Sequence, residues 1–463
     1  MATKSKTAPY VCSECGWTSL KWVGRCGECQ AWGTVIEARP SGSRSGLSHI
    51  NALTPTSPAQ PITDVSKQAS IKSPTGVGEF DRVLGGGLVP GVVVLLAGEP
   101  GVGKSTLLLD VAARAAAAAA ERGAAPVLYV TGEESAPQVR ARAERIGALH
   151  PHLLLAAESD VATILGHVER NAPSLLIVDS IQTISDSDVE GGAGGVAQVR
   201  AVASTLVNLS KSRDMPTMIV GHVTKDGSIA GPRVLEHLVD VVCQFEGDKH
   251  SRLRMVRAVK NRYGATDEVG CFELIDAGIR ELPDPSGVFL SSRNLTVPGT
   301  CVTIALEGRR PIPVEVQGLS TPTAGPPRRT TSGVDSSRVA MMLAVLQSRL
   351  HIEFEKREIF VSTIGGAKAT EPASDAAIAL ALTSSAADMP LAPGVVAIGE
   401  VALTGELRPV VGLQQRLNEA ARLGFQIAII PANSADVTAP AGLRVRAVRN
   451  IHEAVGKVLP PLH

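Results

Sequence analysis

The chain has no excess of charge of either sign, because its 45 Lys and Arg residues balance 45 Asp and Glu residues. Net charge therefore predicts no polyanionic partner, and any nucleic-acid surface must be a local patch. Aromatic residues make up only 3% of the chain, yet 44% of its residues are hydrophobic, which is enough for sizeable buried cores. The 463 residues are sufficient for two or three domains.

A long apolar run is also missing. The first ten residues, MATKSKTAPY, contain no apolar stretch of the kind found in signal peptides, and no strongly hydrophobic run reaches about 18 residues. These absences predict a cytoplasmic protein with no membrane partner. The alanine tract from Ala115 to Ala120 is short and is expected to be helical.

Cysteine is scarce, and four of the seven cysteines form two C-x-x-C pairs separated by ten residues. In a cytosolic chain this pattern favours a metal site, with two disulfides or a redox pair as the alternative. Thiolates at this spacing can close a tetrahedral Zn²⁺ site. The predicted ligands are Cys12, Cys15, Cys26 and Cys29.

The remaining cysteines and the tryptophans have no motif of their own. Cys243, Cys271 and Cys301 are expected to be buried hydrophobic residues. We expect the tryptophans near the cysteine pairs to pack around the metal site, with base or partner stacking as the alternative: Trp17, Trp22 and Trp32.

Composition divides the rest of the chain into modules. Residues 38–72 and the segment STPTAGPPRRTTSG are rich in Pro, Ser, Thr, Gly or Ala, so they are interpreted as linkers. Between them, β-branched apolar runs alternate with helical patterns, which predicts an α/β domain with a mainly parallel sheet. The predicted order is a zinc module (1–37), a linker (38–72), an α/β domain (73–285), a connecting segment and linker (286–333) and an α+β domain (334–463).

The segment GEPGVGKST matches the P-loop pattern G-x-x-x-x-G-K-[ST]. A strand-forming run, VVVLLA, precedes it and a helix-forming run follows it. In this arrangement the glycines let backbone N–H groups face phosphates, and the helix amino terminus adds a positive end. The sequence therefore predicts ATP or ADP binding by Gly98, Glu99, Pro100, Gly101, Val102, Gly103, Lys104, Ser105 and Thr106.

Within this loop, we expect Lys104 to reach the β- and γ-phosphates and the Ser105 hydroxyl to bind Mg²⁺. Asp179 follows the apolar run Leu175–Val178, at the carboxyl end of a predicted strand, where ligands of such sheets bind. Phosphoryl transfer needs a carboxylate near the metal, so Asp179 is the second predicted Mg²⁺ residue. The alternative is an aspartate that ends the strand in a turn.

Glu133 and Glu134 follow the predicted strand VLYVT. Glu133 is the candidate that polarises the attacking water, and Glu134 is the second choice; either could be a first-turn carboxylate of a helix. His222 and Lys225 follow another strand and could sense the γ-phosphate or contact DNA, although an ordinary loop histidine fits equally well.

Lys260 and Arg262 stand two residues apart in KNRYG, so on a strand they point to the same side. They could contact the γ-phosphate held by a neighbouring subunit, like an arginine finger in trans, or form a solvated basic strand face. The surrounding run RLRMVRAVKNR holds five cations and no acid, and could form a phosphate-binding stripe.

Two segments carry a resemblance to a known family. TGVGEFDRVLGGGLVPG, ahead of the P-loop, resembles the opening of RecA-like ATPase cores, and KNRYG is similar to the KNRFG signature of the bacterial RadA (Sms) DNA-repair family, with Tyr263 in place of Phe. The three modules stand in that family's order, and the resemblance covers nearly the whole chain.

This resemblance implies a RecA-like fold and a DNA-stimulated, helicase-like ATPase that uses ATP, Mg²⁺ and Zn²⁺. It also implies a ring, most often a hexamer, around single-stranded DNA. Such a ring would process branched recombination intermediates and promote branch migration of RecA-mediated strand exchange in double-strand-break repair, with the RecA recombinase as a partner.

The carboxyl-terminal segment VAIGEVALTGELRPVVGLQQRLNEAARLGFQIAIIP resembles the catalytic domain of Lon proteases, which use a Ser-Lys dyad. Ala373 stands at the matched nucleophile position and Gln414 at the matched lysine position, while Ser374 lies one residue beyond the nucleophile. Nucleophilic catalysis needs a hydroxyl and a base within about 3 Å, so an assembly or DNA-binding scaffold is predicted in place of a peptidase. An ATP-dependent protease and a nucleotide-regulated, clock-like scaffold are the competing functions.

Overall fold

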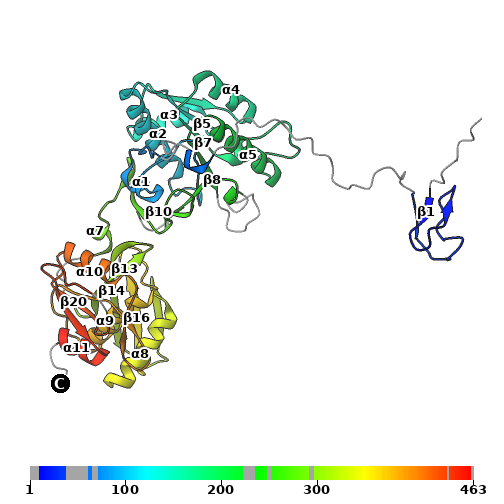
Figure 1. The fold of residues 1–463 in the computed structure, drawn as a ribbon. Coiled ribbons are helices and arrows are strands. Elements are labelled where there is room, and N and C mark those ends of the chain that lie inside the picture. The colour runs from blue at the N-terminus through cyan, green and yellow to red at the C-terminus, as the bar shows by residue number, and fades with distance from the viewer. Residues whose placement is uncertain are drawn as a thin grey trace, which may run out of the picture. The chain divides into compact units, whose positions relative to one another are not determined.

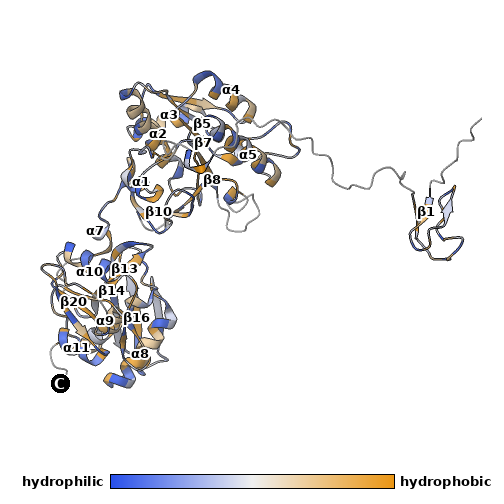
Figure 2. Cartoon of the chain, in the orientation of Figure 1, coloured by the Kyte–Doolittle hydropathy of each residue, from blue (hydrophilic) through white to orange (hydrophobic). Residues whose placement is uncertain are grey.

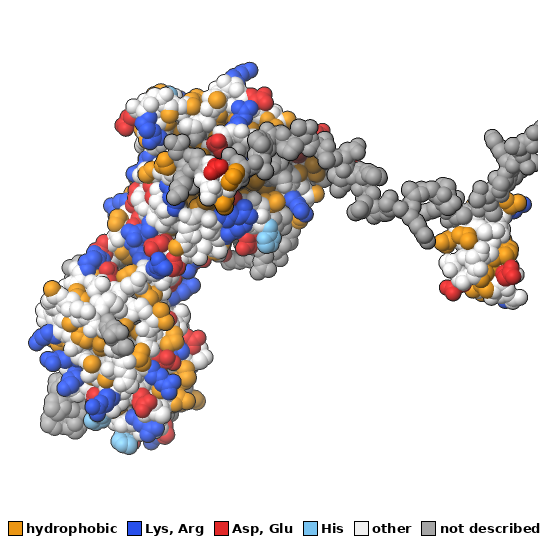
Figure 3. All heavy atoms as spheres, in the orientation of Figure 1, with side chains coloured by type: hydrophobic (Ala, Val, Ile, Leu, Met, Phe, Trp, Pro, Cys, Tyr) orange, Lys and Arg blue, Asp and Glu red, His pale blue; other side chains and the backbone are white. Residues whose placement is uncertain are grey.

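The computed structural model describes residues 10–37, 61–64, 71–222, 235–247, 252–290, 297–434 and 437–459. The chain forms two compact units, Met1–Val65 and Ser66–His463 (Figure 1). Among the described segments, no helix combines the length and the apolar character needed to cross a membrane. On the face seen in Figure 3, acidic and basic side chains are interspersed, in keeping with the balanced charge of the sequence.

The first unit contains a small antiparallel sheet in the order β2-β1-β3. Its strands are β1 (Tyr10–Cys12), β2 (Thr18–Ser19) and β3 (Val35–Glu37), and a short 3-10 helix, η1, spans Ile62–Asp64. The buried cluster of this sheet holds only Cys12, Cys26 and Val35 as fully buried members. So small a core cannot stabilise the module by itself, and a bound metal or a disulfide must supply most of the folding energy.

The second unit begins with a nine-stranded sheet in the order β12-β11-β10-β9-β4-β8-β7-β5-β6. Strands β4 to β9 pair in parallel with one another, and β10 to β12 are antiparallel additions at one side. The strands are β4 (Val93–Gly98), β5 (Val127–Thr131), β6 (Leu153–Ala157), β7 (Leu175–Asp179), β8 (Thr217–His222), β9 (Val241–Glu246), β10 (Leu253–Asn261), β11 (Val269–Ile275) and β12 (Gly278–Glu281).

Helices cover both faces of this sheet, whereas α7 lies in the segment that leads to the carboxyl-terminal part, where Phe289 joins the core of that part (Figure 1). Leu96 packs into one core and Leu95 into the other, because successive side chains of a strand point to opposite faces. Both faces are therefore apolar, and the central strands are continuous hydrophobic runs (Figure 2). The helices are α1 (Gly78–Leu84), α2 (Lys104–Glu121), α3 (Ala136–Arg145), α4 (Val161–Asn171), η3 (Ile181–Thr183), α5 (Val196–Ser212) and α7 (Ser286–Phe289).

The carboxyl-terminal part is a seven-stranded sheet in the order β15-β16-β14-β13-β17-β20-β21, with a separate pair, β18-β19. The helix α9 is buried along most of its length beside β13 and β14. The strands are β13 (Thr300–Glu307), β14 (Arg310–Pro322), β15 (Arg329–Ser332), β16 (Arg357–Thr363), β17 (Val395–Ala397), β18 (Glu400–Val401), β19 (Leu407–Arg408), β20 (Ile427–Pro431) and β21 (Arg444–Val448), and the helices are α8 (Ser336–Leu350), η4 (Pro372–Ser374), α9 (Asp375–Ala387), α10 (Leu413–Arg422) and α11 (Ile451–Val458).

The segment 286–333, expected to be a connection and linker, instead supplies β13, β14 and β15 to this sheet. The Pro- and Thr-rich stretch after residue 319 led to the linker interpretation. However, TCVTIALE and PIPVEV, which precede it, contain β-branched residues that pair antiparallel as a long hairpin. The carboxyl-terminal sheet therefore begins near residue 300, ahead of the boundary expected at 334.

Candidate active site

The P-loop joins β4 to α2 at the carboxyl edge of the nine-stranded sheet. Gly98 ends β4 where a Cβ atom would lie 2.5 Å from the carbonyl oxygen of Phe245, so only glycine fits. Gly103 has φ of 109°, a conformation that favours glycine, and it immediately precedes the helix. The Lys104 ammonium donates to the carbonyls of Gly98 and Glu99, each at 2.9 Å, and is thereby held over the loop.

Arg254 supports the loop from the neighbouring antiparallel strand β10. Its guanidinium is buried, and Nε donates to the carbonyl oxygen of Val102 at 3.2 Å. This contact fixes the carbonyl side of the loop, so that the opposite, N–H side can face a phosphate group. Sequence reasoning missed this role because Arg254 stands in a basic run that seemed to be a surface feature.

Asp179 lies at the same edge, since Thr131 of β5 pairs with Asp179 of β7 and Gly98 of β4 pairs with His222 of β8. Its Oδ2 accepts a hydrogen bond from the Tyr129 hydroxyl at 2.6 Å. Its buried Oδ1 has no hydrogen-bond partner among the described residues. An unshared carboxylate oxygen on the same edge as Ser105 is the donor set that Mg²⁺ prefers, so the predicted metal residues fit that ion.

Electrostatic effects indicate that three predicted residues lie near one another. Burial lowers the pKa of Lys104 from its usual 10.5 to about 8, whereas the negative charges of Asp179 and Glu133 oppose that shift. Burial, together with the charge of Asp179, raises the pKa of Tyr129 well above its usual value, so this hydroxyl is protonated and donates. The structure therefore brings Lys104, Asp179 and Glu133 together, as ATP hydrolysis requires.

The two glutamates after β5 have different surroundings. Glu134 forms an ion pair with Arg142 of α3, and its backbone N–H donates to the Thr131 hydroxyl at 3.0 Å. The side chain of Glu133 is 54% exposed, and its Oε2 lies 3.3 Å from Nε2 of His222. Glu133 is thus available to a water in the site, whereas Glu134 is engaged in holding α3. Lys225, the other residue considered after β8, lies outside the described residues.

Lys260 and Arg262 lie at the other edge of the sheet, where β9 begins. Lys260 Nζ donates to the carbonyl oxygens of Glu236 and Val239, at 2.5 and 2.9 Å. Arg262 Nη1 lies 3.0 Å from Oδ1 of the buried Asp240, whose Oδ2 accepts from the N–H of Val93 at the start of β4. Five steps along β4, at roughly 3.3 Å each, separate this edge from the P-loop. Neither cation can reach the nucleotide site of its own chain.

The basic run that contains these residues does not form one continuous stripe, which one interpretation of the sequence had allowed. Arg254 is buried against the P-loop, and Arg257 forms an ion pair with Glu246 at 3.5 Å. Residues of a strand alternate between its two faces, and a bulge between Ala258 and Lys260 changes the register further. The cations therefore point to separate partners.

In the first unit the four predicted zinc ligands converge, with all four Sγ atoms within 4.8 Å of one another. Two of the Sγ–Sγ distances are 3.7 Å (Cys12 to Cys29) and 3.5 Å (Cys15 to Cys26). Four sulfurs around a tetrahedral Zn²⁺, with bonds of about 2.3 Å, would lie ~3.8 Å apart. The four thiols are therefore suitably placed to hold a tetrahedral zinc ion.

The other cysteines and the tryptophans give a mixed outcome. Cys243, Cys271 and Cys301 are buried as predicted, and burial raises their pKa values to about 12, 11 and 12, so they stay protonated. Trp17 packs against the cysteine cluster, but Trp22 and Trp32 are 62% and 75% exposed, so the expectation that all three pack around the metal site was wrong. Of the three tryptophans, Trp17 is the one that packs against the buried cluster of the described module.

The matched protease positions of the carboxyl-terminal part carry no dyad. Ala373 is buried, and the buried Ser374 hydroxyl finds no hydrogen-bond partner within the described ranges. Gln414 uses its amide to bind Asn418 and the backbone of Thr438. A polypeptide substrate could not reach the buried Ser374, so this hydroxyl is unsuited to be a nucleophile.

A glycine-rich loop after a central parallel strand, with carboxylates from neighbouring strands at the same edge, is the arrangement of RecA-like P-loop ATPases. Comparison with protein-family models agrees. Residues 78–228 match an AAA domain, residues 10–37 match the rubredoxin metal binding domain, and residues 335–460 match the Lon protease (S16) C-terminal proteolytic domain.

The chain belongs to the RadA family of DNA repair proteins. It is 52% identical to DNA repair protein RadA of Mycolicibacterium smegmatis, with 98% of this chain and 97% of that protein aligned. The DNA repair protein RadA of Bacillus subtilis is 44% identical, with 98% of each chain covered, and that of Streptococcus pyogenes serotype M1 is 42% identical, with 98% and 99% covered. The family and the RecA-like fold expected from the sequence are confirmed.

Proposed function

We propose that this chain is a DNA-stimulated ATPase motor that processes branched recombination intermediates and promotes branch migration during RecA-mediated strand exchange. Membership of the RadA family supports the repair context. The observation that carries the proposal is the meeting of Lys104, Asp179 and Glu133 at one sheet edge, because a scaffold that only binds nucleotide has no need of an exposed carboxylate there. The partners are single-stranded and branched DNA and the RecA recombinase.

In this site Lys104 stabilises the charge that develops on the β- and γ-phosphates, and the N–H groups of the loop hold the phosphate chain. Mg²⁺, held through Ser105 and Asp179, would neutralise further phosphate charge. Glu133 orients and polarises the attacking water. Its contact with His222, at the end of β8, offers a route by which events at that strand change the glutamate's position.

The site needs one more cation, and we assign that role to a neighbouring subunit. Lys260 and Arg262 cannot reach their own P-loop, and the Arg262 side chain is 53% exposed although it pairs with Asp240. In the proposed ring, this end of the sheet meets the neighbouring chain. In a homo-oligomeric ring, most often a hexamer in this family, they complete the site of the adjacent chain. The carboxyl-terminal part is a scaffold for assembly or DNA binding without peptidase activity, in view of Ala373 and Gln414.

The first test measures ATP turnover with and without single-stranded DNA. Lys104→Ala should abolish turnover. Glu133→Gln should bind ATP normally and lose turnover by about 100-fold or more, the usual contribution of a positioned base. Glu134→Gln is the matched control: it breaks the Arg142 ion pair and should retain turnover within a few fold, with a lower melting temperature.

Wild-type turnover that DNA leaves unchanged would contradict the motor and favour a nucleotide-regulated scaffold. Normal turnover in Glu133→Gln together with loss in Glu134→Gln would transfer the catalytic role to Glu134. ATP-dependent cleavage of casein that is lost in Ser374→Ala would establish the protease as the correct alternative.

A further inference from the structure

Tyr129 contacts the carboxylate that the proposed mechanism uses for Mg²⁺. It lies on β5 two residues before Thr131, which pairs with Asp179 on β7, so Tyr129 and Asp179 are diagonal neighbours on the same face of the sheet. A tyrosine is long enough to bridge such a diagonal pair. Its hydroxyl donates to Oδ2 of Asp179 at 2.6 Å.

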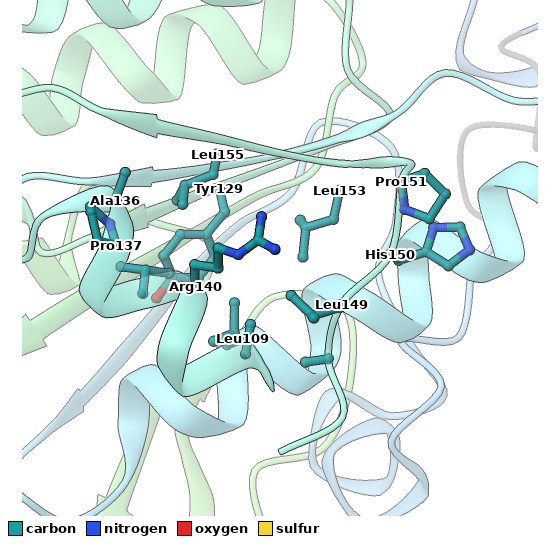
Figure 4. A pocket seen from close by; sticks show the side chains of 13 residues that line it. Leu109, Tyr129, Ala136, Pro137, Arg140, Leu149, His150, Pro151, Leu153 and Leu155 are labelled. Carbon is teal, nitrogen blue, oxygen red and sulfur yellow. The ribbon is translucent and has the colours of Figure 1, made fainter. Parts of the chain in front are cut away.

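The ring of Tyr129 is held firmly. It is fully buried and lies among the side chains that line an apolar groove of about 630 Å³ beside α3, together with Leu109 of α2, Val139 of α3 and Leu153 of β6 (Figure 4). Because α2 also begins with Lys104, the same packing connects the ring to the helix that starts the nucleotide site. The hydroxyl therefore occupies a defined place relative to the P-loop.

The hydrogen bond from Tyr129 gives the two carboxylate oxygens of Asp179 different surroundings. Oδ2 is engaged by Tyr129, and the buried Oδ1 has no hydrogen-bond partner in the described part of the chain. A carboxylate held at one oxygen cannot rotate freely, so the other oxygen keeps one direction. Hydrogen bonds of this kind orient the groups that hold metals, and their loss usually costs about 10- to 100-fold in metal affinity.

We propose that Tyr129 is a positioning residue for the Mg²⁺ site, which holds Asp179 so that Oδ1 faces the metal bound with the nucleotide. This proposal rests on the proposed ATPase function for the identity of the ligand. Tyr129 contacts neither the nucleotide nor the metal. Its hydroxyl increases the factor by which Mg²⁺ raises the affinity for the nucleotide.

The experiment measures the affinity of the fluorescent analogue mant-ATPγS for full-length protein in excess Mg²⁺ and in EDTA. Tyr129→Phe keeps the ring and removes only the hydroxyl. We expect its affinity in EDTA to equal that of the wild type, and the factor by which Mg²⁺ tightens binding to fall by about tenfold or more. Mn²⁺, followed by electron paramagnetic resonance on the nucleotide complex, should show a matching loss of affinity.

Leu153→Ala is the control for packing, since Leu153 lines the same groove and makes no contact with Asp179 that the structure shows. It should lower the melting temperature and leave the Mg²⁺ factor unchanged. An unchanged Mg²⁺ factor in Tyr129→Phe overturns the proposal, and so does an equal loss of affinity in EDTA. None of these measurements involves hydrolysis. A wild type that binds mant-ATPγS with Mg²⁺ but fails to turn over ATP would contradict the proposed motor, and the role of Tyr129 in Mg²⁺ binding could still be tested.

Discussion

At the scale of single residues, the site depends on which charges are satisfied inside the chain and which are left for a ligand. Glu134 and Arg142 neutralise each other, and Asp240 is shared between Arg262 and Lys211. Lys104 differs, since its hydrogen bonds are to two backbone carbonyls, and burial makes its positive form unfavourable. A phosphate group would restore the preference for that form.

This leads to a pH dependence of nucleotide binding. The pKa of Lys104 is lowered to about 8 in the chain described here, and bound phosphate should raise it, so binding above pH 8 takes up a proton. Affinity for ADP in EDTA should be constant below pH 8 and fall by up to about tenfold per pH unit above it, as one-proton linkage requires. Titration calorimetry in two buffers of different ionisation enthalpy measures the proton directly.

Lys104→Arg provides the matched control, because a guanidinium stays charged throughout this range. Its ADP affinity, if weaker overall, should not vary between pH 7 and pH 9.5. A wild-type affinity that is equally flat would show that Lys104 keeps a pKa near 10.5 in the folded chain.

At the scale of elements, the sequence predicted the parts whose pattern is local. VVVLLA before a glycine loop became β4, and the alanine-rich run became α2. Each depends on periodicity or on a loop motif within about 20 residues. The candidate residues of the nucleotide site came from the same rule, since polar residues that follow parallel strands meet at one edge.

The features that were missed depend on contacts between distant segments. Arg254 supports Val102 across 152 positions of sequence, and the Tyr129 hydroxyl reaches Asp179 across 50. Nothing in a local pattern indicates either contact. The hairpin β13–β14 was missed for a different reason: the Pro- and Thr-rich stretch after residue 319 suggested a linker, although the eight-pair register of β13 and β14 precedes it.

The cysteine module allows a direct test of its metal. Purified, freshly reduced protein should contain about one zinc per chain, because four thiolates complete one tetrahedral site. Changing Cys26 and Cys29 together to Ala should abolish zinc retention, whereas Cys301→Ala, a buried cysteine outside the cluster, should leave it at the wild-type level. Elemental analysis checks all three proteins. Zinc near zero in the wild type would favour the disulfide alternative.

At the scale of the whole molecule, the decisive question is whether each nucleotide site is shared between chains. The two groups that the proposed mechanism combines lie at opposite edges of the sheet in one chain, with Lys104 at one edge and Arg262 at the other. The same geometry excludes a finger that acts on its own chain. It leaves a contact in trans, a DNA contact or internal coupling as the candidate roles of KNRYG.

Mixing inactive mutants distinguishes these roles. Lys104→Ala has a broken P-loop and an intact finger, and Arg262→Ala has the reverse, so mixed rings should regain part of the activity. Each single mutant should be inactive, Arg262→Ala through the loss of a group that can contribute about 10³-fold or more. Arg262→Lys is the control for folding, since it preserves a charge for Asp240 but not the guanidinium. No recovery in rings shown to be mixed would assign KNRYG to DNA or to internal coupling.

The placement of Lys260 and Arg262 also has a consequence for mass action. Under the proposed mechanism, a single chain is inactive because its catalytic groups lie on opposite edges. Activity per chain then rises with the concentration of assembled rings and not in simple proportion to the amount of protein. Dilution therefore lowers the activity per chain, and a modest fall in the amount of this protein lowers ATP consumption more than proportionally. Under the proposed mechanism, dispersed single chains do not hydrolyse ATP, and hydrolysis is confined to places where chains have already assembled.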